Sequence, residues 1–307
     1  MTISTTIAGV KVKSFVGTAS GCYDTTDSEV KELAASTNFL TIKSTTEYPR
    51  VGNAEPRIAW LMDWVSQQSM GLPNRGLTDT LATVKDIARR GLTIKASIAG
   101  LSLEENITLM RAFQRSEVSL IELNMSCPNT GEKVLAYDFD ALDHHLGNLT
   151  HLGNIPIGLK LPFYNSIESQ NRIVDLSVKH GLGFLTCING MPGLAIDIEK
   201  EQTMIAPNGG VGAIGGSYIQ PFALLECHRY AGLLKDTGIA LIGVGGVDSG
   251  AAAFRFALAG CDAVEVGSYL QANGPSVIPK INNALAGILQ RKGYQSPAEV
   301  KGKLKFL

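Results

Sequence analysis

Eight short apolar segments, several rich in β-branched residues, alternate along the chain with longer segments of helical periodicity. Continuous apolar runs of this length are typical of strands that are buried on both faces, as in parallel sheets. We predict strands at residues 14–19, 39–42, 92–98, 120–124, 156–160, 184–188, 240–244 and 263–266. We predict helices at residues 79–90, 139–151, 167–180, 221–236, 249–259 and 276–291, and capping-box spacing predicts two more helix starts at Thr26 and Ser102.

This alternation predicts an α/β fold, a (β/α)8 TIM barrel that takes up residues 1–307 as a single domain. Such barrels have about 250 residues, so a chain of this length has room for insertions. The additional residues fall mainly in 44–78 and 199–219, which we interpret as long loops that cover the C-terminal mouth of the barrel. A doubly wound open sheet is the alternative.

Composition excludes several classes of protein. The formal net charge is -1, which provides no basic surface for nucleic acid. The five cysteines are scattered and odd in number, without CxxC spacing, so we expect no disulfide framework and no metal site. We find neither a signal peptide pattern nor a stretch near the roughly 18 apolar residues of a membrane span. A reducing cytoplasm fits this pattern best.

Polar and glycine residues follow almost every predicted strand. The carboxyl ends of parallel strands meet on one face of a barrel, where active sites are built. Groups that are far apart in the sequence are therefore expected to converge there. They are Ser20, Gly21, Lys43, Ser44, Asn124, Lys160, Asn189, Gly245, Gly246, Gly267 and Ser268.

The glycines after the seventh and eighth strands predict a phosphate site. GVGG at residues 243–246 and Gly267-Ser268 each precede a helix start, where backbone N–H groups and the helix dipole favour an anion. Lys43 and Lys160 end two apolar strands and are suited to an anionic ligand or a developing negative charge. Lys160 alone would also suit a Schiff-base lyase on a phosphate-binding barrel.

Motifs along nearly the whole chain resemble the dihydroorotate dehydrogenases, specifically the cytosolic, fumarate-using class 1A. The most specific are SMGLPN at residues 69–74, NMSCPN at 124–129 and LAYDF at 135–139. TASG at 18–21, GLKLP at 158–162 and GAIGGSYIQP at 212–221 extend the match. The resemblance implies an FMN flavoprotein that oxidises (S)-dihydroorotate to orotate in pyrimidine biosynthesis. It also implies a homodimer that uses fumarate and needs no iron–sulfur subunit.

The resemblance assigns a role to each matching position. Cys127 would be the catalytic base that takes the proton from C5 of the substrate. The cofactor would contact Ala19, Ser20, Gly21, Lys43, Ser44, Asn124, Lys160, Ile188, Gly245, Gly246, Gly267 and Ser268. The substrate would contact Lys43, Gln68, Met70, Gly71, Leu72, Asn124, Asn129, Asn189 and Gly190.

Two of the substrate positions depart from the family pattern. Gln68 stands where the family has asparagine, and Gly190 stands where the family has serine. A site built for hydrogen bonding discriminates strongly when one partner is missing. An FMN-dependent paralogue that acts on a different cyclic amide or enone is therefore an alternative to dihydroorotate oxidation.

Overall fold

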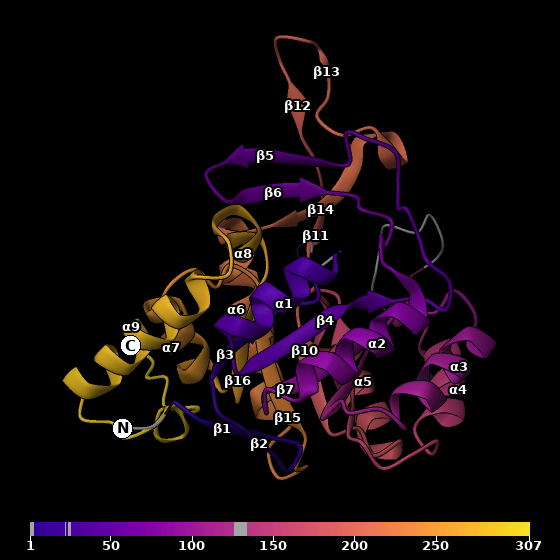
Figure 1. Ribbon diagram of the computed structural model, residues 1–307. Coiled ribbons are helices and arrows are strands. Elements are labelled where there is room, and N and C mark those ends of the chain that lie inside the picture. Colours follow the sequence, from indigo (N-terminus) through magenta and orange to yellow (C-terminus); the bar gives the residue numbers. More distant parts are fainter. Residues whose placement is uncertain (1–2, 22, 24–25, 126–133) are drawn as a thin grey trace.

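Eight parallel strands form the barrel predicted from the sequence (Figure 1). The computed structural model describes residues 3–21, 23, 26–125 and 134–307. Within them the barrel strands follow the order β3-β16-β15-β10-β9-β8-β7-β4. Their bounds are β3 (Val16–Thr18), β4 (Phe39–Thr45), β7 (Thr93–Ile98), β8 (Leu120–Leu123), β9 (Ile157–Leu161), β10 (Phe184–Cys187), β15 (Ala240–Val244) and β16 (Ala263–Val266).

The barrel closes between its first two strands through a side chain. The backbone N–H of Thr41 in β4 donates to Thr18 Oγ1 in β3, with 3.0 Å between the atoms. The other neighbouring strands are joined by parallel ladders, including β16 to β3. This closure confirms the predicted barrel and contradicts the open doubly wound sheet.

Helices surround the strands, as the sequence predicts (Figure 1). They are α1 (Asp27–Ser36), α2 (Gly76–Ala88), α3 (Leu103–Phe113), α4 (Phe139–Leu149), α5 (Ile167–Lys179), α6 (Gln220–Leu233), α7 (Gly250–Ala259), α8 (Ser268–Asn273) and α9 (Val277–Arg291). Short 3-10 turns occur at Leu135–Tyr137, Pro207–Gly210, Ser217–Ile219 and Pro297–Glu299. Among the described helices, none combines the length and hydropathy needed to cross a bilayer.

Only one of the two predicted capping boxes is complete. Thr26 accepts from the N–H of Glu29, and the Glu29 carboxylate accepts from the N–H of Thr26. Ser102 caps α3 in the same way, but Glu105 does not complete the box. Its carboxylate accepts instead from the N–H groups of Leu101 and Glu47. Glu105 thus fixes the segment after β4 to α3, a tertiary contact that local spacing does not reveal.

The two segments interpreted as long loops contain strands, so that part of the prediction was wrong. β5 (Ile58–Met62) and β6 (Val65–Gln68) pair with β14 (Val211–Gly215) and β11 (Met191–Leu194) in a four-stranded antiparallel sheet. This sheet, with the small hairpin β12 (Ile196–Asp197) and β13 (Gln202–Thr203), lies over the barrel mouth (Figure 1). We call β5, β6, β11 and β14 the lid sheet.

A buried glutamine joins the parts of the lid sheet. Gln67 in β6 donates through Nε2 to the carbonyls of Gly193, at 2.7 Å, and Gly210, at 2.8 Å. The two partners are more than 120 residues away from it in the sequence. This pairing between distant segments explains why a local pattern indicated loops.

A hairpin closes the opposite end of the barrel. β1 (Thr5–Ile7) and β2 (Val10–Val12) place Ile7 and Val12 against Phe39 and Phe184, the first residues of two barrel strands. All four side chains are almost completely buried. The hairpin therefore seals the amino-terminal end, and the mouth under the lid sheet is left as the site for chemistry.

Candidate active site

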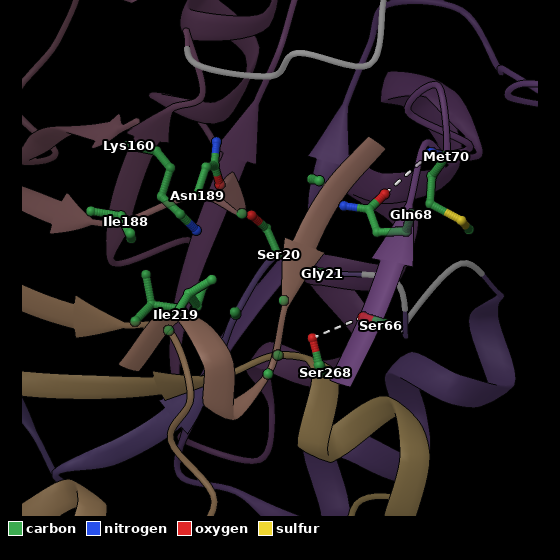
Figure 2. A pocket seen from close by; sticks show the side chains of 18 of the residues that line it. Ser20, Gly21, Ser66, Gln68, Met70, Lys160, Ile188, Asn189, Ile219 and Ser268 are labelled. Atoms are coloured by element: carbon green, nitrogen blue, oxygen red, sulfur yellow. Dashed lines mark hydrogen bonds between the residues drawn. The ribbon is translucent and has the colours of Figure 1, made fainter. Parts of the chain in front are cut away.

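One pocket lies between the carboxyl ends of the barrel strands and the lid sheet (Figure 2). Every residue predicted to contact the cofactor lines it: Ala19, Ser20, Gly21, Lys43, Ser44, Asn124, Lys160, Ile188, Gly245, Gly246, Gly267 and Ser268. Of the predicted substrate residues, Gln68, Met70, Leu72, Asn189 and Gly190 also line it. Gly71 is not in the lining, and Cys127 and Asn129 lie outside the described residues.

The glycine turns after β15 and β16 meet at one end of this pocket. Gly245 and Gly246 have φ values of 125° and 72°, which L side chains rarely adopt. A side chain at Gly246 would also press on Gln220, whose amide donates to the Gly246 carbonyl. Beside them, Ser268 at the start of α8 accepts from Ser66 Oγ of β6, at 3.3 Å. Backbone N–H groups and hydroxyls at this end suit an anion such as a phosphate.

Two lysines enter the pocket from the barrel wall. Lys43, two residues before the end of β4, donates to the carbonyl of Gly21 and is 7% exposed. Lys160 of β9 is 3% exposed and directs its amine into the pocket (Figure 2). Positive charge at two buried points favours a ligand that carries or develops negative charge.

A chain of hydrogen bonds fixes the amides between the lysines. Asn189 Nδ2 donates to Asn124 Oδ1 at 3.0 Å, and Asn124 Nδ2 donates to Ser44 Oγ at 2.9 Å. Ser44 in turn lies 2.9 Å from the hydroxyl of Ser97. These bonds set the orientation of both amides, so the pocket is organised before a ligand arrives.

A tight turn after β6 forms the pocket wall on the lid side. Gly71 and Leu72 both have left-handed φ, 72° and 57°, and Asn53 holds the turn through hydrogen bonds to Ser69 and Met70. Successive residues of this kind point backbone N–H groups toward one concavity that suits an anion. Gln68 Oε1 accepts from the N–H of Met70 at 3.2 Å (Figure 2).

Gly190 lies where the barrel meets the lid sheet. A Cβ atom at this position would stand 2.9 Å from both Ala213 Cβ and the carbonyl oxygen of Ile214. Real Cβ atoms are essentially never that close to other atoms. The absence of a side chain at residue 190 therefore lets β14 approach the strand end closely.

Sequence reasoning missed part of the pocket and the charges beneath it. The lid sheet, the segment that follows it and β15 also contribute Ser66, Ala213, Gly215, Gly216, Ile219 and Val244. Under the pocket, Lys95, Glu122 and Glu265 are 0% exposed inside the barrel. The signal for these three was present, since each interrupts an apolar strand with a charge, but one strand does not reveal which charges meet.

Comparisons with known proteins agree with this architecture. The dihydroorotate dehydrogenase family model matches residues 2–289. A curated relative from Streptococcus pyogenes, named putative dihydroorotate dehydrogenase A (fumarate), is 38% identical over 294 residues, with 94% of this chain and 93% of the relative covered. The dihydroorotate dehydrogenase (fumarate) of Kluyveromyces lactis is 38% identical over 297 residues, with the same coverage.

A solved structure supports the fold independently. The crystal structure of an Eimeria tenella enzyme, titled DHODH in complex with ferulenol, superimposes with a TM-score of 0.84. The superposition covers 98% of this chain and 88% of that chain at 19% identity, a level that establishes the fold alone. By sequence, the match to the family model and the identity to its curated members show that this chain belongs to the dihydroorotate dehydrogenase family.

Proposed function

We propose that this protein oxidises (S)-dihydroorotate to orotate in de novo pyrimidine biosynthesis, with bound FMN and with fumarate as the electron acceptor. The names of the relatives support this substrate and this acceptor. One observation carries the proposal: a single pocket brings the glycine turns, both buried lysines and the ordered amides together under the lid sheet. The family assignment favours this chemistry over a Schiff-base lyase.

The charges and the side-chain-free turns of the pocket support FMN as its ligand. The phosphate would lie at the Gly245, Gly246 and Gly267 turns, where side chains are absent and backbone N–H groups are near. Lys160 and the Asn124 amide would contact the flavin ring system at the strand ends. The lid sheet would then enclose the substrate against the exposed ring face.

Residues of the chain itself would bind the substrate, orient it and take up its proton. Lys43 and the N–H groups of the turn at Met70 and Leu72 would bind the substrate carboxylate. Asn124 and Asn189 would orient the pyrimidine edges. Cys127, which follows β8, would take the proton from C5, while bound FMN supplies the acceptor for the hydride that leaves C6. Lys160 would stabilise the negative charge that this transfer creates. Fumarate would then take up a hydride and a proton and become succinate.

A second candidate keeps the cofactor and changes the substrate. The contact distances around Gly190 leave no room for the serine of the family pattern, and Gln68 Oε1 occupies the N–H of Met70. Both features alter the wall that faces the substrate. They favour a different cyclic amide or enone as the alternative substrate of the same flavin site.

We propose further that the protein is a single-domain homodimer of the cytoplasm. Met62, Leu194, Ile196 and Ile198 on or beside the lid are each at least half exposed, and such apolar side chains favour a partner surface. Cys187, Cys227 and Cys261 are free thiols, which suits a reducing compartment. Sedimentation should give a dimer, and Ile196→Asp should shift it toward monomer.

Anaerobic titration tests the proposed function. The purified protein should show a flavin spectrum, and added dihydroorotate should bleach it. Fumarate should then restore the colour. A flavin-loaded protein that dihydroorotate fails to bleach but a related cyclic amide bleaches would favour the second candidate. A protein that neither carries nor binds FMN would contradict both.

A further inference from the structure

Three buried charges lie inside the barrel beneath the pocket. Lys95 of β7, Glu122 of β8 and Glu265 of β16 are each 0% exposed. The Lys95 ammonium pairs with Glu122 Oε2, and it lies 2.5 Å from Glu265 Oε1. Thr41 Oγ1 also donates to Glu265 Oε1, at 2.9 Å. One ammonium therefore stands between two carboxylates in a space closed to water.

Glu122 links these charges to the pocket. Its second oxygen, Oε1, lies 3.9 Å from the Nζ atom of Lys160. Lys160 directs the same amine into the pocket, where the cofactor is proposed to bind (Figure 2). The two oxygens of Glu122 therefore face different lysines. Oε1 faces Lys160, which lines the pocket, and Oε2 pairs with Lys95, which does not line it.

This arrangement affects the electrostatic potential in the pocket. A carboxylate beside an ammonium cancels much of its positive potential when water is excluded. Lys95 compensates the Glu122 carboxylate from the other side, so less of the cancellation falls on Lys160. Burial opposes the charge of Glu122, but the Lys95 and Lys160 ammonium groups outweigh burial and hold the pKa of Glu122 below its usual value.

We infer that Glu122 sets the strength of the positive charge that Lys160 presents to the cofactor, and that Lys95 and Glu265 are positioning residues that determine how much of the Glu122 carboxylate acts on Lys160. This inference rests on the proposed function, because it assigns the charge a flavin to act on. Reduced FMN carries more negative charge than oxidised FMN. Stronger positive charge at Lys160 therefore favours the reduced form.

Two variants should move the flavin midpoint potential in opposite directions. The double variant Lys95→Met/Glu265→Gln removes the Lys95 ammonium together with its Glu265 partner and leaves Lys160, among the described residues, as the one lysine beside the Glu122 carboxylate. We expect its ratio of reduced to oxidised flavin at a fixed potential to fall about tenfold, which is about 30 mV for a two-electron couple. Glu122→Gln removes the carboxylate and should raise the potential. Equilibration of the bound flavin with a reference dye measures both shifts.

Lys95 and Glu265 are substituted together because removing only one partner of a buried ion pair is strongly destabilising. Replacement of both partners by neutral side chains is often tolerated. Leu285→Ala in α9 is the control, because Leu285 is fully buried and lies outside the barrel interior. It should lower stability and leave the potential unchanged. The ratio of FMN dissociation constants for the reduced and oxidised states should change by the same factor as the ratio of reduced to oxidised flavin at a fixed potential.

The outcomes separate this inference from the proposed function. Variants that bind FMN with the wild-type potential, or that both shift it in the same direction, would overturn the role of Glu122 while the flavin assignment stands. If the wild-type protein binds no FMN, the proposed function fails first. Opposite shifts, with Leu285→Ala unchanged, support the inference even if dihydroorotate is not the substrate.

Discussion

The side-chain oxygen of Gln68 accepts a hydrogen bond from the backbone N–H of Met70, with 3.2 Å between Oε1 and N. The same N–H belongs to the left-handed turn that we propose as the binding site of the substrate carboxylate. The glutamine oxygen therefore stands where a carboxylate oxygen of the substrate would bind. A carboxylate that binds there would have to displace it, so residue 68 would control access to the proposed anion site.

Gln68→Glu should weaken binding of dihydroorotate. The substitution keeps the shape, adds a negative charge beside the proposed carboxylate site and forms a stronger bond to the Met70 N–H. We expect KM for dihydroorotate to rise about tenfold or more, since 1.4 kcal/mol is already a factor of ten. Dihydrouracil, which lacks the carboxylate, serves as the control ligand and should bind as before. Equal weakening of both ligands would contradict a carboxylate site at this turn.

Gly190→Ala should destabilise the protein and displace the lid sheet. The new methyl group would meet Ala213 Cβ and the Ile214 carbonyl oxygen at 2.9 Å. Overpacking of this kind costs about 1–3 kcal/mol. Urea unfolding measures the loss, and Gly190→Ala/Ala213→Gly should recover part of it. Gly232→Ala in α6 is the control, because apart from its own stretch of helix no atom of the described residues lies within 4 Å of that Cβ position. Equal stability of the Gly190 and Gly232 variants would sink this explanation.

The sequence was sufficient to predict the barrel and the part of the pocket lining that the barrel strand ends provide, because both depend on where buried strands end. Lys43, Asn124 and Lys160 mark the ends of strands whose apolar character is local and continuous. Once the strands are assigned, the topology of a parallel barrel brings these ends together. No knowledge of long-range contacts is needed for this step.

The lid sheet and the buried charges could not be predicted in the same way. Ser66 and Ala213 reach the pocket because β6 pairs with β14, across about 145 residues of sequence. Neither segment shows a pattern that selects the other. Lys95, Glu122 and Glu265 each looked unfavourable in a buried strand, and only their positions around the closed barrel show that they neutralise one another.

Thr18→Val should weaken the barrel closure. Thr18 Oγ1 accepts the N–H of Thr41 at 3.0 Å, where a regular ladder would use a backbone carbonyl. Valine keeps the shape but leaves that buried N–H without its acceptor, which costs about 1–3 kcal/mol. Chemical denaturation should show the lower stability. Thr150→Val is the control, because its half-buried hydroxyl donates to the Leu146 carbonyl at the carboxyl end of α4, away from the barrel closure. A Thr18 variant as stable as wild type would show that the side chain does not hold the closure.

Cys127→Ala should slow oxidation of dihydroorotate strongly and leave flavin binding intact. The residue lies outside the described part of the chain, so its proposed role rests on the NMSCPN motif. Loss of a general base typically slows a reaction by about 10²–10⁴-fold. Stopped-flow bleaching of the bound flavin measures this step directly. Cys227→Ala is the control, because Cys227 is a buried free thiol and should leave the bleaching rate unchanged. Equal rates in the two variants would assign the base to another residue.

Glu226 should make stability depend on pH. It is fully buried in α6, and burial raises the pKa of its carboxyl to about 7, against smaller opposing effects of Tyr164, the Gln170 amide at 2.6 Å and Arg229. The folded state therefore prefers the neutral acid. This contribution is complete below the ordinary pKa of 4.5 and is lost as the pH rises through about 7.

Glu226→Gln should remove this dependence. At pH 8 the variant should be more stable than wild type by about 3 kcal/mol, since each pKa unit corresponds to about 1.4 kcal/mol. At pH 4.5 the two should differ little, because the amide resembles the neutral acid. Urea unfolding across this range measures the difference, and Glu168→Gln, exposed on α5, should follow wild type throughout. A constant gap between Glu226→Gln and wild type at every pH would contradict a raised pKa for Glu226, because a carboxyl changes stability with pH only if it takes up or releases a proton on folding.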